Sequence, residues 1–341
     1  MSILSVANLS HGFADKKLYD DAGFELNKQD HMGIVGQNGA GKSTLIKILT
    51  GTILPDEGSV KWQNKVTYGY LDQYADIPDG DTLYQFLTTA YAHLFALKDK
   101  MDKCYADYAE NLDDDLLEKA GRIQETLEAN NFYDIDTEIA RVMTGLGLDD
   151  IGRDHIVSEM SGGQRSKIIL AKLLLQNPDV LLLDEPTNYL DTAHIDWLEN
   201  YLTNFTGAFI VISHDYDFLT EITNCICDVA FGKITKYRGN FKAAMKQKDA
   251  RKEAQLKAFE KQQVVIEKAE KFIRKNKAGS HSTMAKSREK MLSHLDRIDP
   301  PSENLRSHFD FPYLETGSQN AVAVKKSVSY THLTLPTICS V

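Results

Sequence analysis

A glycine-rich segment near the N-terminus has the residue types and spacing of a phosphate-binding loop. Residues 36–44 read GQNGAGKST and fit the pattern G-x-x-x-x-G-K-[ST]. The apolar run before the segment predicts a strand over 32–35, and the residues after it predict a helix over 43–49. Because the N–H groups of such a turn meet at a positive helix N-terminus, the segment predicts a triphosphate site. The alternative is a chance glycine-rich turn, and the other motifs decide between the two.

Two side chains of this loop have the chemistry to hold a phosphate and its metal. Lys42 is expected against the β- and γ-phosphates, and the Ser43 hydroxyl is expected to ligate Mg²⁺. The ligand predicted by the loop is therefore a nucleoside triphosphate with Mg²⁺. The residues predicted to line it are Gly36, Gln37, Asn38, Gly39, Ala40, Gly41, Lys42, Ser43 and Thr44.

Polar side chains that suit hydrolysis follow two apolar runs later in the chain. The run 180–183 predicts a buried strand that leads into Asp184 and Glu185, and α/β sheets place their sites at such strand ends. Asp184 suits Mg²⁺ held through water, and Glu185 suits the orientation or deprotonation of an attacking water. His214 follows the next apolar run, 208–213. A single histidine is more often structural, but this one ends the strand that comes next in the chain.

Three further features could belong to a nucleotide site, but each also has an ordinary structural explanation. Ser161 is a natural N-cap for a periodic helix, and Gly162 and Gly163 allow a ligand to approach closely, although an ordinary helix cap has the same residues. Gln73 ends a strand-like stretch, where glutamine is usually a polar loop residue. Phe13 could stack on a nucleotide base, although a buried or turn position is the more common one for a phenylalanine.

Composition indicates a cytosolic globular protein. The 341 residues allow one large domain or two ordinary ones, with 26% charged and 42% hydrophobic residues. No run of about 18 apolar residues offers a membrane span, and the N-terminus lacks the basic and apolar regions of a signal peptide. The four cysteines are too few for a disulfide framework. Cys225 and Cys227, which alternate in a predicted strand, are expected to pack rather than to bind a metal.

The net charge of −10 is distributed unevenly along the chain. Residues 242–297 contain 16 Lys and Arg against 7 Asp and Glu, so this stretch carries +9 and the remainder carries −19. Such a separation of sign predicts a basic arm on an acidic body.

Taken together, the motifs resemble the nucleotide-binding cassette of the ABC ATPase superfamily. GQNGAGKST, Gln73, MSGGQ, LLLDEPTNYLD and ISHD occur in the order and spacing of that family. The resemblance implies an α/β fold, a P-loop NTPase cassette with a helical subdomain and arm insertion. It also implies ATP and Mg²⁺ as ligands and ATP hydrolysis as the reaction.

The resemblance gives each motif residue a role. Phe13 corresponds to the aromatic residue that stacks on the base, and Gln73 to the residue near Mg²⁺ and the attacking water. Asp191 corresponds to the D-loop residue, and His214 to the residue that contacts the γ-phosphate. The signature motif corresponds to Ser161, Gly162, Gly163 and Gln164, preceded by Met160 in place of the usual leucine.

In this family the signature of one cassette completes the ATP site of another. The physical reason is that a helix N-terminus offers donors to a γ-phosphate, but one cassette does not present both surfaces to the same ATP. We therefore expect a partner cassette, either in cis in the intact gene or in trans in a homodimer. A single cassette is expected to hydrolyse ATP weakly.

The basic stretch predicts an α-helical hairpin linker. A long helix is expected over 242–276, a turn over 276–283, and a return helix to about 297. PTNYLD, RGNF and KSREKML resemble the ABC-F family, whose members are soluble proteins with two cassettes that act on ribosomes. In that family the hairpin reaches from the tRNA exit site toward the peptidyl-tRNA, and a basic hairpin suits rRNA and tRNA phosphates. A solvated structural linker is the alternative.

The sequence divides into five expected parts. A cassette is expected over 1–240, with a helical, acidic arm insertion at about 82–147. The basic hairpin is expected over 241–300, and 301–330 is expected to hold a connector and the start of a second cassette. The residues 331–341 contain no P-loop and resemble a non-native tail on a truncated gene product.

The predicted function is that of an ABC-F translation factor that closes on the ribosome with ATP and leaves after hydrolysis. Antibiotic-resistance ribosome protection is an alternative within the family, although the short hairpin turn favours a housekeeping factor. The ATPase subunit of an ABC membrane transporter and a DNA-associated ATPase are alternatives from other classes. The transporter alternative leaves the hairpin without a purpose.

Overall fold

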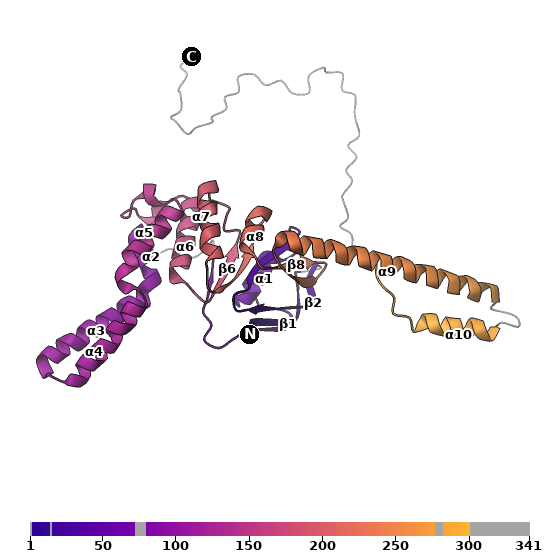
Figure 1. The fold of residues 1–341 in the computed structure, drawn as a ribbon, viewed down its shortest axis with the longest axis horizontal. Helices are drawn as coiled ribbons and strands as arrows, with labels where there is room; N and C mark the ends of the chain where they lie inside the picture. The colour runs from indigo at the N-terminus through magenta and orange to yellow at the C-terminus, as the bar shows by residue number, and fades with distance from the viewer. Residues whose placement is uncertain (1, 14–15, 72–79, 277–281, 301–341) are drawn as a thin grey trace, which may run out of the picture. The chain divides into compact units, whose positions relative to one another are not determined.

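The computed structural model describes residues 2–13, 16–71, 80–276 and 282–300. These residues belong to one compact unit, Met1–Pro301. Two sheets with surrounding helices form an α/β cassette, and two further helices follow in the chain (Figure 1). The predicted α/β fold class is confirmed. The connector expected over 301–330 and the tail expected over 331–341 lie outside the described residues.

A six-stranded sheet positions the site, with strand order β5-β6-β7-β3-β8-β9. The strands are parallel except for β9, which pairs with β8 in the antiparallel sense. Because parallel strands end at the same edge, the residues that follow β3, β6 and β7 are brought to one edge. The strands are β3 His31–Gly36, β5 Tyr68–Tyr70, β6 Val180–Asp184, β7 Ala208–Ile212, β8 Cys225–Ala230 and β9 Lys233–Arg238.

The buried strands divide their side chains between two hydrophobic clusters. Leu181 belongs to one cluster and its neighbour Leu182 to the other, since successive side chains of a strand point to opposite faces. Helix α1 (Lys42–Leu49) packs into the cluster of Leu182, and helix α6 (Gly162–Gln176) packs into the cluster of Leu181. The two helices that follow the glycine-rich motifs therefore belong to different cores.

A second, antiparallel sheet has the order β2-β1-β4. Its first two strands have 12 residues each, and polar residues interrupt the apolar alternation in the halves near their connection. His11 and Tyr19, which lie in those halves, are buried. The strands are β1 Ser2–Phe13, β2 Lys16–Asn27 and β4 Glu57–Trp62.

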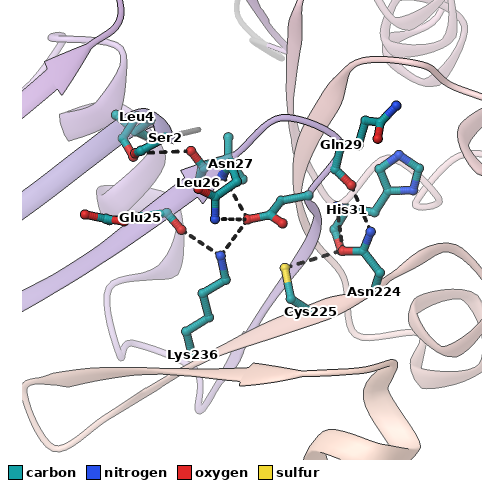
Figure 2. Close-up of polar contacts among 11 residues, drawn as sticks. Ser2, Leu4, Glu25, Leu26, Asn27, Gln29, His31, Asn224, Cys225 and Lys236 are labelled. Carbon is teal, nitrogen blue, oxygen red and sulfur yellow. Dashed lines mark hydrogen bonds and ion pairs between the residues drawn. The ribbon is translucent and has the colours of Figure 1, made fainter.

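A polar network ties the turn between β2 and β3 to strand β9 (Figure 2). The Lys236 ammonium donates to the Glu25 carbonyl at 2.7 Å and pairs with the Asp30 carboxylate at 2.6 Å. The same carboxylate accepts the backbone N–H of Asn27 at 2.8 Å. Lys236 therefore joins the antiparallel sheet to the central sheet, at the start of the strand that leads into the glycine-rich loop.

The described residues between β5 and β6, from 80 onward, are mainly helical. Helices α3 and α4 lie side by side (Figure 1). Short 3₁₀ turns lie at Thr89–Tyr91, Phe132–Asp134, Asp149–Ile151 and Val157–Glu159. The helices of this stretch and of the rest of the cassette are α2 Leu83–Thr88, α3 Ala92–Asn111, α4 Asp114–Ala129, α5 Ile135–Gly145, α6, α7 Thr192–Thr203 and α8 Tyr216–Ile222.

Two antiparallel helices follow the cassette. Helix α9 (Phe241–Asn276) has 36 residues, and α10 (Ser282–Ser293) packs along its distal part (Figure 1). The Arg288 guanidinium lies 3.8 Å from the ring centroid of Phe272, which is a cation–π contact between the two helices. The turn between the helices lies outside the described residues apart from their end residues.

The return helix is shorter than the sequence predicts. It was expected to run to about 297 and ends at Ser293. The Gln262 side chain of α9 donates to the Asp296 carbonyl at 2.7 Å and accepts the Ile298 N–H at 2.8 Å. These bonds satisfy a carbonyl and an N–H of the segment that follows the helix, and Pro300 has no N–H with which a continued helix could pair the Asp296 carbonyl.

Cys225 and Cys227 pack in the core as free thiols. Ile226 between them is also buried, because β8 is covered on both faces, so the expected alternation of burial is absent. Burial raises the pKa of Cys225 to about 12, and thiols of this kind are unreactive.

Candidate nucleotide-binding site

The glycine-rich loop connects the end of β3 to the start of α1. Gly36 is the last residue of β3, and a Cβ there would lie 2.5 Å from the Val229 carbonyl of β8. Gly41 caps α1 with a φ of 103°, a left-handed conformation that favours glycine, and a Cβ there would lie 2.6 Å from the Tyr19 hydroxyl. The glycines of the motif therefore allow the loop to pass close to its neighbours.

The Lys42 side chain folds back over the loop. Its ammonium donates to the Gly36 carbonyl at 2.9 Å and to the Gln37 carbonyl at 3.2 Å, and the residue is only 7% exposed. No described side chain caps the first turn of α1. A buried cation beside uncapped N–H groups at a helix N-terminus is the arrangement that binds a phosphate.

Two residues that the sequence did not single out support the loop. The Tyr19 hydroxyl donates to the Gly41 carbonyl at 2.5 Å, and the Lys16 ammonium donates to the Gly39 carbonyl at 2.7 Å. Tyr19 is fully buried, and burial raises the pKa of its phenol, so the hydroxyl remains a donor. Both come from β2, and each lies more than twenty positions in the chain from its partner in the loop, so no local pattern could have found them.

The carboxylate and histidine predicted from the strand ends lie together. Asp184 pairs with Ile212 in the β6–β7 register, and the Glu185 N–H donates to the Ile212 carbonyl at 2.9 Å. The His214 N–H donates to one Glu185 carboxylate oxygen at 3.3 Å, and His214 Nε2 lies 3.5 Å from the other. The register of two buried strands thus places the predicted catalytic pair within reach of each other.

Glu185 has three features that fit a catalytic base. Its φ of 51° is left-handed, which is uncommon outside glycine and occurs often at active sites. Its buried Oε1 has no hydrogen-bond partner among the described residues. Burial, which outweighs the opposing effect of nearby His214, raises the pKa of its carboxyl. A raised pKa makes a carboxylate a better acceptor of a proton from water.

The signature segment forms the N-terminus of α6. The Ser161 hydroxyl accepts the Gln164 N–H at 3.3 Å, and the Gln164 amide oxygen accepts the Ser161 N–H at 2.9 Å, which is a capping box. Gly162 is exposed and would meet nothing within 4 Å if it carried a Cβ, and Gly163 is half-buried near Tyr189. The preceding Met160 is buried in the core.

The remaining predicted residues occupy separate places. Asp191 caps α7 by accepting the His194 N–H at 3.2 Å and is exposed. Phe13 ends β1 and is 52% exposed. Gln73 lies outside the described residues, so its predicted place near Mg²⁺ stays a prediction.

The residues present fit Mg·ATP. Ser43 is exposed in the first turn of α1, and the half-buried Asp184 is the last residue of β6, at the same edge of the sheet. Their side chains offer a hydroxyl and a carboxylate, which are the hard oxygen ligands that Mg²⁺ prefers. The Gln37, Asn38 and Gly39 residues of the loop are exposed and open to a ligand, while Ala40 and Thr44 are half-buried.

These features define a P-loop nucleotide-binding cassette. A family model described as ABC transporter matches residues 19–188, and a second model with the same description, for an extension, matches residues 227–311. The chain belongs to the ABC transporter family of ATP-binding proteins.

Curated relatives support the same assignment over most of the chain. YfmM of Bacillus subtilis, named as an uncharacterized ABC transporter ATP-binding protein, is 42% identical over 94% of this chain and 62% of its own length. ABC transporter F family member 2 of Arabidopsis thaliana is 32% identical over 94% of this chain and 49% of its own. EttA of Escherichia coli, named energy-dependent translational throttle protein, is 33% identical over 74% of this chain and 45% of its own length. The chain thus spans about half of the length of most of these relatives.

A solved ATP-binding subunit of an ABC transporter has the same fold. It superposes with a TM-score of 0.52 at 17% identity, over 70% of this chain and 90% of that chain. Among the described residues, no helix combines the length and apolar character needed to cross a membrane.

Proposed function

We propose that this chain is one half of an ABC-F ATPase that binds Mg·ATP between two cassettes. The observation that carries the proposal is the division of the motifs. Lys42 and its loop belong with α1 in one core, whereas Ser161 begins α6 in the other. A second cassette, in cis in a longer protein or in trans in a homodimer, would present its own signature helix to the ATP held here.

The roles within the site follow from the geometry and from the family pattern. Lys42 and the loop N–H groups bind the phosphates, and Ser43 and Asp184, with Gln73, hold Mg²⁺. Bound Mg²⁺ supplies charge neutralisation for the β- and γ-phosphates. Glu185 accepts a proton from the attacking water through its orphaned Oε1. His214 holds that carboxylate and, as the family pattern implies, would contact the γ-phosphate.

We further propose that the intact protein acts on ribosomes in the cytoplasm. The support is the likeness to EttA, whose name refers to translation, together with the +9 charge over 242–297. Positive charge on a helical hairpin attracts the phosphates of rRNA and tRNA. In this proposal the cassette ends near 240, the arm insertion covers about 82–147, and the hairpin is the linker to a second cassette over 241–300.

The test uses the full-length gene with Glu185 and its second-cassette counterpart changed to Gln. Loss of the base with retained ATP binding should trap the protein on ribosomes, so it should co-sediment with them through sucrose in ATP but not in ADP. A Glu110→Gln variant, on the exposed face of α3, is the matched control. A double variant that stays at the top of the gradient at low salt contradicts the ribosomal proposal. Co-purification with a membrane permease would favour the transporter alternative.

A further inference from the structure

A buried histidine lies beneath Phe13, the aromatic residue that the family pattern predicts to stack on the base. His11 and Phe13 are two residues apart on β1, where the pairing with β2 has an irregular register between His11 and Gly12. The His11 residue is 6% exposed, whereas Phe13 is 52% exposed. The ring centroids are 5.0 Å apart at an interplanar angle of 82°, which is an edge-to-face contact. The exposed ring therefore rests on a buried one.

The imidazole is held by packing more than by hydrogen bonds. Its Nδ1 lies 3.4 Å from Asp56 Oδ2, an ion-pair distance, yet neither ring nitrogen has a hydrogen-bond partner among the described residues. A buried polar group without a partner is costly, and such groups in a folded protein call for an explanation. The contact with Phe13 is the one specific ring interaction that His11 makes in the described part of the chain.

Asp56 fixes the backbone on either side of this histidine. Its carboxylate accepts the Gly12 N–H at 3.0 Å, and its own N–H donates to the Ser10 carbonyl at 3.1 Å. Asp56 lies in the connection between α1 and β4, so the end of β1 is tied to the segment that follows the phosphate-binding helix. The strand end that carries Phe13 is thereby held against the connection between α1 and β4.

We propose that His11 is a positioning residue for the nucleotide base: it sets the orientation of Phe13 and so contributes to affinity for the base end of the ligand. The inference rests on the proposed function, because it assumes that this site binds ATP and that Phe13, as the family pattern predicts, stacks on the base. It assigns to His11 no contact with the phosphates, which are held by Lys42 and its loop.

The test compares Mg·ATP and Mg·ADP binding by calorimetry for the purified chain and its variants. Loss of one edge-to-face ring contact should weaken both nucleotides about two- to tenfold in His11→Ala. Because the two ligands share the base and differ in phosphate number, the ratio of their affinities should stay as in the wild type. His11→Phe should restore binding, since an apolar ring replaces an imidazole that makes no hydrogen bond. His93→Ala, an exposed histidine on α3, is the matched control.

Each of the following outcomes overturns the proposal. Unchanged affinity in His11→Ala removes the role, and a changed ATP-to-ADP ratio places the effect at the phosphates. Failure of His11→Phe to bind more tightly than His11→Ala, with both variants folded by circular dichroism, shows that the ring contact is not what matters. A wild-type chain that binds neither nucleotide refutes the proposed function itself, and Phe13→Ala with normal affinity refutes only the base-stacking premise.

Discussion

In the central sheet, β6 buries every residue from Val180 to Leu183 and β7 buries all five of its residues, whereas the 36 residues of α9 bury only Ala244, Ile266 and Ala269. The site residues of the cassette follow these buried strands, so packing on all sides fixes their positions. The hairpin presents mainly solvent-facing charge and exposed apolar side chains such as Val264. Single side chains should therefore decide function in the cassette, and groups of charges should decide it in the hairpin.

Group substitution in the hairpin is expected to give the largest effect on RNA binding. Lys268, Lys271 and Lys275 are exposed on α9, and changing all three to Gln should weaken binding to ribosomal RNA by on the order of tenfold to a hundredfold near physiological salt. The slope of log affinity against log salt should also become shallower. Filter binding across a salt series measures both.

The matched control removes the same number of positive charges from the arm insertion. It changes Lys100, Lys103 and Lys119, on α3 and α4, to Gln. Equal losses in the two triple variants would mean that the hairpin has no special part in RNA binding and that only net charge matters. The comparison between cassette and hairpin would then fail.

A smaller effect is expected from loosening the hairpin itself. Phe272→Ala removes the ring beneath Arg288, a contact worth about 0.5–1 kcal/mol at an exposed site. Hydrogen exchange of amides in distal α9 and in α10 should accelerate about two- to fivefold, while amides of β3 and β7 keep their protection. Leu256→Ala, also on α9 and exposed, is the control. Faster exchange in the sheet as well would show that the two regions unfold as one unit.

The smallest expected effect concerns the stability of the cassette. Because burial raises the pKa of Glu185, the folded state holds that proton more tightly than the unfolded state does. The free energy of unfolding therefore falls as pH rises through the range between the two pKa values. Glu185→Gln removes this loss of stability, so the variant should melt at a higher temperature than the wild type at neutral pH. The difference between the two melting temperatures should become smaller as the pH is lowered toward the ordinary pKa of a carboxyl group.

Thermal melts at several pH values measure this difference, with Glu110→Gln as the exposed control. A variant that is less stable than the wild type at neutral pH would mean that the carboxylate stabilises the fold, contrary to the effect of burial. The Glu185 carboxylate would then not lower the stability of the cassette in exchange for its role in hydrolysis.

The sequence predicted the features that depend on local patterns. The glycine-rich loop, the carboxylates after β6 and the capping box at Ser161 are each encoded within about ten residues, and the structure has the strands and helices that they require. Features that depend on distant contacts were missed. The Tyr19 hydroxyl reaches Gly41 across 22 positions, and no periodicity marks it. The end of α10 was misplaced because side chains of α9 pair the backbone that follows it.

Glu185 shows the boundary between the two kinds of prediction. Its residue type and its place after an apolar strand indicated a base, which the sequence gives directly. Its contact with His214 arises from the β6–β7 register, which brings together residues 29 positions apart, and its left-handed φ and its unpaired oxygen are likewise seen only in the folded chain. The sequence therefore predicted the chemical role of Glu185, whereas its electrostatic environment could be seen only in the folded sheet.

The proposed function requires that the loop around Lys42 binds a triphosphate. A titration of the purified chain with Mg·ATP measures this binding. We expect saturable binding that Lys42→Ala weakens by about a hundredfold, because the variant removes a buried charge beside the loop that would hold the phosphates. Lys47→Ala, which changes an exposed lysine on the same helix, should bind as the wild type does. Absent binding in the wild-type chain, or equal affinity in the two lysine variants, would contradict the account.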